Sequence, residues 1–263
     1  MVKNMCLLLF AAAAFGGGTA AAKPEHGYLE PGSVAITRIL PPAPVKGDIR
    51  YEADRKIYEA MRRLVGGPRW TYATADVRYD TPTLMGDFAC AAGMPLDPAS
   101  LPATYRLLTR ASIDTSNANT AAKDYWRRLR PFQIDPGATC ESAASVGKSF
   151  DYPSGHTTKG WTVGLILAEL LPDRATPILT RARAYGESRI VCRVHNASAV
   201  DAGRLGATAV MTAIRATPAF QTDLALARAE IARARAAALP PDPARCAAEA
   251  AVLSPSVLAG VRR

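Results

Sequence analysis

Apolar residues recur at helical intervals along most of the chain, and no segment alternates β-branched with polar residues over the length of a strand. Because helices and strands have different periods, this pattern predicts an all-α fold in which alanine and leucine pack between helices. At 263 residues with 21% charged side chains, the chain is long enough for one sizeable core and too apolar for intrinsic disorder. We expect helices at about 48–64, 71–78, 82–92, 98–110, 113–129, 155–171, 174–187, 196–215 and 218–238.

The segment before the first helix is predicted to be an extended arm. Residues 23–47 are rich in proline, which disfavours the interior of a helix or sheet. The prolines that decide this are Pro31, Pro41, Pro42 and Pro44. Asp48 is a suitable N-cap, and residues 48–263 are expected to form a single helical domain. Its first helix would turn one face to the core, comprising Ile49, Ala53, Ile57, Ala60 and Met61.

The first 22 residues have the features of a secretory signal peptide. A short apolar run, Met5–Phe15, follows one lysine and precedes the small-residue site Ala20–Ala22. A membrane anchor is the alternative, but the run is shorter than the roughly 20 residues that a spanning helix needs. The most apolar later segment, Trp161–Leu171, is interrupted by Glu169. We therefore expect an exported protein with no stable membrane association.

Four cysteines follow the expected cleavage site: Cys90, Cys140, Cys192 and Cys246. An even number in an oxidising compartment permits two disulfides, in any of three pairings that the sequence does not distinguish. Buried free thiols are the alternative for any one of them. None forms a C-x-x-C pair, so a zinc ribbon has little support.

Basic residues exceed acidic ones, 32 to 23, which raises the question of nucleic-acid binding. The most basic stretch, about 224–239, has no interleaved aromatic residues and matches no recognition motif, so a solvated helix face is expected and no nucleic-acid partner. The three histidines, His26, His156 and His195, are too few for a histidine-rich metal cluster. We expect no metal site.

The first stretch with chemical potential contains Lys123 and Arg130, seven positions apart and followed by Pro131. Two helical turns separate the cations, so both side chains would leave the same face of one helix. A lysine and an arginine placed in this way could clamp an anion. A solvated basic helix is the ordinary alternative.

The second stretch is Pro153-Ser154-Gly155-His156. Ser154 is a good N-cap, and Gly155 lets a ligand approach the backbone where the next helix begins. The free N–H groups there favour an anion, and His156 is placed to exchange a proton with it. A capping serine beside an ordinary surface histidine is the alternative reading.

The third stretch begins with Ser188 and Arg189 and reaches His195. It brings another guanidinium close in sequence to a histidine. Taken alone, a histidine in a mixed apolar run is more often a partly buried structural residue. Each stretch has an ordinary structural explanation, and the three indicate a function only when they are considered together.

In order and spacing, they resemble the signature of the bacterial class A non-specific acid phosphatases, within the wider superfamily of type 2 phosphatidic acid phosphatases and vanadium haloperoxidases. That signature reads K-x6-R-P, then P-S-G-H, then S-R-x5-H-x3-D. The resemblance implies a compact all-α helical bundle in the periplasm that hydrolyses small phosphate monoesters without a metal or cofactor, although phosphate or vanadate could occupy its site. A haloperoxidase is the alternative enzyme.

Carried over residue by residue, the resemblance makes His195 the nucleophile that forms a phosphohistidine and His156 the general acid and base. It implies phosphate binding by Lys123, Arg130, Ser154, Gly155 and Arg189. Fixed positive charge of this kind suits the transferring phosphoryl group. An Ala-rich helical surface could also support a homo-oligomer.

One position departs from the signature. The aspartate expected four residues after the nucleophilic histidine, where it would accept the imidazole N–H, is Ala199. Asp201 would point elsewhere on a helix, and Ser198 could accept only a weaker hydrogen bond. We therefore expect reduced phosphatase activity that Ala199→Asp would raise. A catalytically weak or inactive phosphate-binding protein is the alternative.

Overall fold

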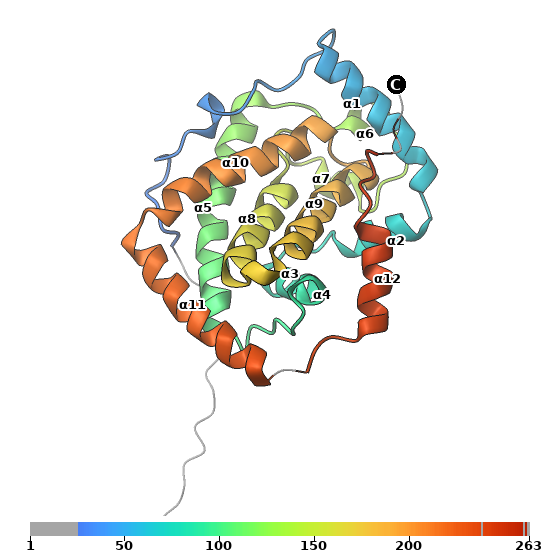
Figure 1. The fold of residues 1–263 in the computed structure, drawn as a ribbon. Helices are drawn as coiled ribbons and strands as arrows, with labels where there is room; N and C mark the ends of the chain where they lie inside the picture. Colours follow the sequence, from blue (N-terminus) through green and yellow to red (C-terminus); the bar gives the residue numbers. More distant parts are fainter. Residues whose placement is uncertain (1–25, 238, 260, 262–263) are drawn as a thin grey trace, which may run out of the picture.

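Four helices meet at the centre of the structure. The computed structural model describes residues 26–237, 239–259 and 261, and within this part of the chain all regular structure is helical. Helices α8 (Gly155–Leu170) and α9 (Ala175–Val191) lie side by side, and α5 (Pro102–Trp126) and α10 (Ala197–Arg215) pack around them (Figure 1). The all-α prediction is therefore confirmed.

Glycine explains how closely the central pair packs. A Cβ atom at Gly160 of α8 would lie 2.4 Å from Cδ1 of Tyr185, and one at Gly164 would lie 2.5 Å from Cβ of Ala182. These two glycines are one turn apart, so they form a flat stripe into which α9 fits. The pairing of residues 160 with 185 and 164 with 182 makes the two helices antiparallel.

Antiparallel packing brings the three sequence motifs to one end of the bundle. Helix α8 also runs antiparallel to α5, since Thr162 bonds to Thr115 at 3.1 Å and Thr158 to Asn119 at 3.0 Å. The carboxyl ends of α5 and α9 therefore lie beside the amino end of α8. A short turn after α9 starts α10 at this same end.

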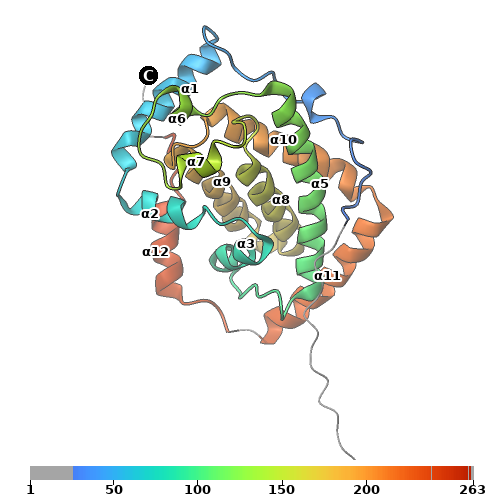
Figure 2. The same cartoon turned by 180° about the vertical axis from the view of Figure 1, so that it is seen from behind.

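Peripheral helices surround this centre. Helix α11 (Pro218–Ala237) packs along α5, and α12 (Pro243–Leu253) lies beside α2 (Pro68–Ala75) and α9. Figure 2 shows the opposite side, where the short helices α3 (Thr81–Asp87) and α7 (Ala143–Val146) lie in front of the central pair. The remaining elements are η1 (Ile36–Arg38), α1 (Ile49–Ala60), η2 (Met61–Leu64), α4 (Ala89–Ala92), α6 (Pro131–Ile134) and η3 (Pro172–Arg174).

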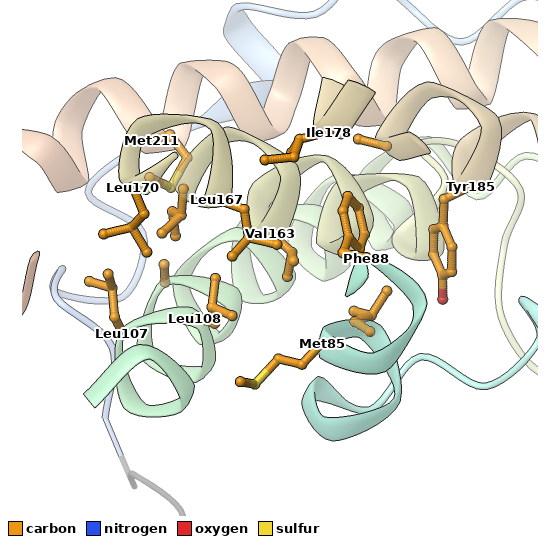
Figure 3. Packing of buried hydrophobic residues seen from close by; sticks show 14 of the residues in the cluster. Met85, Phe88, Leu107, Leu108, Val163, Leu167, Leu170, Ile178, Tyr185 and Met211 are labelled. Atoms are coloured by element: carbon orange, nitrogen blue, oxygen red, sulfur yellow. The ribbon is translucent and has the colours of Figure 1, made fainter. Parts of the chain in front are cut away.

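The largest hydrophobic cluster fills the space between α5, α8 and their neighbours (Figure 3). Its large members are fully or nearly fully buried, which gives most of the apolar contribution to stability. They include Met85, Phe88, Leu107, Leu108, Val163, Leu167, Ile178, Tyr185 and Met211. Among the described helices, none is both long and apolar enough to cross a membrane.

Several predicted boundaries were wrong. The helices expected at 98–110 and 113–129 are one 25-residue helix, α5, since neither proline nor glycine separates them. The segment 82–92 is instead divided between α3 and α4. The short helix η1 interrupts the arm that proline was expected to leave irregular, and α6, α7 and α12 were missed.

The face expected for the first helix is only partly buried: Met61 is in the core and Ile57 and Ala60 pack against it, but Ile49 and Ala53 are exposed. Helix α1 buries Asp54 and Tyr58, while Ile49 is 87% exposed. The reason is a polar contact: Asp54 accepts a hydrogen bond from the backbone N–H of Ser198 at 2.9 Å. An ion pair with Arg128 at 2.8 Å adds to it.

Two disulfides select one of the three cysteine pairings that the sequence left open. Cys90 is bonded to Cys246, which ties α4 to α12, and Cys140 is bonded to Cys192 at the end of α9. The second bond fixes the loop that carries Glu141 beside Arg189. The expected signal peptide at 1–22 lies outside the described residues.

Candidate active site

A cavity of about 300 Å³ lies where the ends of the central helices meet. All three sequence motifs contribute to its wall, which confirms only that they come together in space. Its lining includes Tyr79, Ser116, Asn119, Thr120, Lys123, Arg130, Glu141, Ser145, Val146, Ser149, Gly155, His156 and His195.

His195 has a defined tautomer. Its Nε2 lies 3.0 Å from a guanidinium nitrogen of Arg130, and its Nδ1 lies 3.0 Å from Oδ1 of Asp151. Because a guanidinium only donates, Nε2 must be the acceptor, and the ring proton sits on Nδ1 and is donated to Asp151. Burial, followed by the charges of Arg130 and Lys123, holds the pKa of His195 well below its ordinary value. The imidazole is thus neutral, with its lone pair beside Arg130.

Asp151 is the functional residue that the sequence analysis missed. It is fully buried, and it accepts hydrogen bonds from the backbone N–H of Asn196 at 3.1 Å and from its side-chain amide at 2.8 Å. Arg128 lies 3.3 Å away as its counter-ion. Burial raises the pKa of Asp151, and the charge of Arg128 opposes that rise. The only sequence signal was a carboxylate two positions before Pro153.

The residues considered as substitutes for the missing aspartate lie elsewhere. Ser198 bonds to Asp54 through both its backbone N–H and its hydroxyl, and does not bond to His195. Asp201 pairs with Arg204 at the surface. The premise that His195 has no carboxylate partner is therefore wrong, because Asp151 supplies one.

His156 is held by a different kind of partner. Its Nε2 lies 2.8 Å from the carbonyl oxygen of Val77, which can only accept, so this nitrogen carries the proton in the neutral ring. Nδ1 is left as the atom that can gain and lose a proton. The ring of Tyr79 lies against the imidazole, with centroids 4.1 Å apart. Burial, then the charge of Arg189, lowers the pKa of His156 well below its ordinary value.

Two cations border the cavity directly. Lys123 donates to the carbonyl of Phe150, and burial, followed by the charge of Arg130, lowers its pKa to about 7. Arg130 donates to the carbonyl oxygens of Ser149 at 2.6 Å and Val194 at 2.8 Å. Burial lowers the pKa of Arg130 to about 10, so it remains charged at neutral pH. These contacts fix both cations before any ligand arrives.

Arg189 is fully buried and does not itself border the cavity. One of its terminal nitrogens pairs with Glu141, which does line the cavity. Within the part of the chain that the structure describes, its Nε and Nη1 atoms have no hydrogen-bond partner. Because unpaired buried donors are unfavourable, these two N–H groups are well suited to an anion.

The two residues at the start of α8 have separate roles. The Ser154 hydroxyl caps the helix, accepting from the backbone N–H of Thr157 at 3.4 Å and from the Thr157 hydroxyl at 3.0 Å. Ser154 does not line the cavity, whereas Gly155 does. A free helix N-terminus at Gly155 adds positive potential next to the cations.

A second, larger cavity of about 490 Å³ adjoins the first and shares Tyr79 and Ser116 with it. Its wall combines an aromatic residue, Tyr105, with hydroxyl-bearing residues of α5. The hydroxyls of two of these, Thr109 and Ser112, are buried and have no hydrogen-bond partner within the described residues.

The described residues hold no cluster of three or more His, Cys, Asp or Glu side chains that could bind a metal. Lys123 and Arg130 make the cavity cationic, two histidines lie on its wall, and fixed positive charge of this kind suits a phosphoryl group. The chain belongs to the PAP2 superfamily, whose model matches residues 105–223.

Several relatives are similar over most of their length. An acid phosphatase of Zymomonas mobilis is 41% identical over 80% of each chain. A non-specific acid phosphatase of Providencia stuartii is 34% identical over 82% of this chain and 89% of its own. Another from Salmonella typhimurium is 33% identical over 73% of this chain and 78% of its own. The resemblance seen in the sequence motifs is thereby confirmed.

Proposed function

We propose that this protein is an acid phosphatase that hydrolyses small phosphate monoesters through a phosphohistidine on His195. One observation carries the proposal: Nε2 of His195 is unprotonated and lies at a cavity bordered by Lys123 and Arg130. Phosphoryl transfer requires an in-line nucleophile and fixed positive charge on the equatorial oxygens. The names of the relatives support the same activity.

The reaction has two steps in this proposal. Nε2 of His195 attacks phosphorus, a P–N bond forms, and the P–O bond to the alcohol breaks. His156, protonated on Nδ1, gives its proton to the departing oxygen. In the second step the neutral Nδ1 takes a proton from water, whose oxygen attacks phosphorus and breaks the P–N bond. Phosphate leaves, and His195 keeps its Nδ1 proton throughout.

The lowered pKa of His156 favours catalysis at acidic pH. His156 must be protonated for the first step, yet burial and Arg189 lower its pKa in the empty site. A bound phosphate group carries negative charge, which offsets Arg189 and raises that pKa again. Lower pH supplies the same proton, so we expect activity to decline as pH rises.

Because Asp151 bonds to His195, we no longer expect reduced activity. That expectation depended on Ala199 leaving the nucleophile without a carboxylate, and Asp151 accepts the Nδ1 proton at 3.0 Å. It also weakens the alternative of an inactive phosphate-binding protein. A vanadium-dependent haloperoxidase remains the alternative enzyme, and oxidation of bromide with added vanadate and peroxide would reveal it.

The second cavity provides a place for the alcohol portion of the substrate. It begins at Tyr79, which lies against the general acid His156. A leaving group protonated by His156 would therefore extend past Tyr79 toward Tyr105. Aromatic walls of this kind favour a substrate that carries a ring.

Export to the periplasm is part of the proposal. Two disulfides, Cys90–Cys246 and Cys140–Cys192, suit an oxidising compartment. The signal-peptide pattern at 1–22 and the bacterial relatives point the same way. Cleavage can be checked by sequencing the N-terminus of the protein recovered from periplasmic extract.

The proposed activity is tested with p-nitrophenyl phosphate and with inorganic phosphate. We expect the wild type to turn over the ester, and His195→Ala to lose turnover while still binding phosphate by calorimetry. His26→Ala is the matched control, because His26 is exposed and outside the cavity. Turnover that survives His195→Ala would contradict the phosphohistidine mechanism, and phosphate binding by a wild type without turnover would favour the inactive alternative.

A further inference from the structure

We propose that Asp151 is the positioning residue for the nucleophile, and that in this chain it performs the task that the family signature assigns to position 199. The inference rests on the proposed function, because it concerns how His195 is made reactive. Asp151 and Ala199 belong to segments that are far apart in sequence but adjacent in the fold. The backbone N–H of Ser154 donates to the carbonyl of Ala199 at 2.9 Å, which joins the two segments next to the imidazole.

The carboxylate is fixed on both oxygens. Oδ1 accepts from His195 Nδ1 at 3.0 Å and from the backbone N–H of Asn196 at 3.1 Å. Oδ2 accepts from the Asn196 side chain at 2.8 Å and lies 3.3 Å from Arg128. Every neighbour of this carboxylate is therefore a donor. Such a set accommodates an ionised aspartate and leaves no free orientation for it.

Burying a carboxylate requires compensation, and the chain supplies it. Arg128 lies between Asp151 and Asp54, at 3.3 Å and 2.8 Å. Asp54 is itself held by Ser198, three residues after His195. The position at 199 needs no charge in this arrangement, and Ala199 is fully buried within the hydrophobic core. Arg128 thus acts on the nucleophile indirectly, by stabilising Asp151.

The effect of Asp151→Asn follows from these donors. An asparagine has one oxygen, and Arg128 together with the Asn196 side chain would draw that oxygen to the Oδ2 position. The NH₂ group would then face Nδ1 of His195 and require it to accept. Arg130 still donates to Nε2, so no tautomer of His195 would satisfy both neighbours, and the imidazole would lose the fixed orientation of its nucleophilic lone pair.

The test compares Asp151→Asn, Ala199→Asp and the double variant, each with p-nitrophenyl phosphate. We expect Asp151→Asn to lower kcat by up to about 10⁴-fold, as for loss of the orienting carboxylate in a catalytic triad. The inhibition constant of inorganic phosphate should change little. The double variant should recover part of kcat, because a carboxylate returns from the other side.

Ala199→Asp alone should lower activity or leave it unchanged, since a second carboxylate would compete for a single imidazole proton. This is the opposite of what the sequence alone suggested. Asp201→Asn is the matched control, because Asp201 is an exposed carboxylate paired with Arg204. Nitrogen NMR of labelled histidine reports the tautomer directly, and we expect Asp151→Asn to replace the single Nδ1–H form of His195 with a mixture of the two tautomers.

Two results would overturn the proposal: a kcat for Asp151→Asn within a few-fold of wild type, or an unchanged tautomer of His195. Thermal unfolding separates a misfolded variant from a mispositioned histidine, and Asp151→Glu serves as the second variant if Asp151→Asn fails to fold. Failure of the proposed function has a different signature. In that case His195→Ala keeps its activity, whatever Asp151→Asn does.

Discussion

The two histidines of the cavity both have lowered pKa values, but His195 is buried, His156 is half-buried, and their surroundings differ. His195 lies between a carboxylate and a guanidinium, which together place its proton on Nδ1 and its lone pair at Nε2. His156 has a neutral carbonyl and the ring of Tyr79 instead. A nucleophile must keep one protonation state, whereas an acid and base must change state in each cycle. The partners match these two requirements.

Replacing each histidine should separate their roles most strongly. We expect His195→Ala to abolish turnover equally for p-nitrophenyl phosphate and for an alkyl phosphate, because no P–N bond can form. His156→Ala should lose far more activity with the alkyl phosphate, whose alcohol needs a proton to leave. General acid catalysis contributes about 10²- to 10⁴-fold in such cases. Steady-state rates with the two esters measure the difference. If His156→Ala lost the same activity with both esters, its assignment as the general acid would be contradicted.

Replacing Arg189 removes a positive charge that lowers the pKa of both histidines. We expect Arg189→Met to lower kcat/KM by about 10²- to 10³-fold, the usual effect of removing one donor to a developing charge. The loss should appear in phosphate affinity as well, because Nε and Nη1 of Arg189 have no hydrogen-bond partner among the described residues. Arg204→Met, which removes a cation paired with Asp201 near the surface, is the control. Unchanged phosphate binding in Arg189→Met would exclude Arg189 from the anion site.

The pH dependence distinguishes the cations from the histidines. Lys123 has a pKa of about 7, so its charge is present below that pH and is lost as pH rises above it. Deprotonation of His156 already reduces kcat/KM at lower pH, and we expect loss of the Lys123 charge to steepen the fall into a second alkaline limb above about pH 7. Lys123→Arg should move the limb to higher pH, and exposed Lys148→Arg should not. A limb that stays in place would assign it to His156 instead.

Replacing Tyr79 should have the smallest effect on activity. The effect should be limited to the binding of the leaving group that His156 protonates. We expect Tyr79→Ala to raise KM for p-nitrophenyl phosphate by a few-fold, since aromatic contacts contribute about 0.5–1.5 kcal/mol. Inhibition by inorganic phosphate, which has no leaving group, should not change. The exposed Tyr125→Ala is the control. An equal effect on phosphate inhibition would show that Tyr79 supports the cation site rather than the leaving group.

The sequence predicted the parts of the site that depend on local pattern. Ser154 caps α8 as expected, but the placement of Lys123 and Arg130 on one helix was wrong. Helix α5 ends at Trp126, and Arg130 reaches the cavity from the start of α6. Helix caps and periodicity involve neighbours within a few residues, so they can be recognised without the fold.

The parts that could not be predicted depend on contacts across the chain. Asp151 reaches His195 over 44 residues, and no local pattern links them. The family signature directed attention to Ala199, and only the packing of the segments at 151–154 and 196–199 reveals the replacement. The pairing of the cysteines was open for the same reason.

The most direct test of the account is the position of the phosphoryl group on the trapped intermediate. The enzyme is mixed with p-nitrophenyl phosphate, quenched in alkali within milliseconds, and analysed by peptide mass spectrometry and phosphorus NMR against phosphohistidine standards. Because Asp151 holds Nδ1, the account predicts phosphate on Nε2 of His195. Phosphate on Nδ1 of His195, on His156, or on no histidine at all would contradict it.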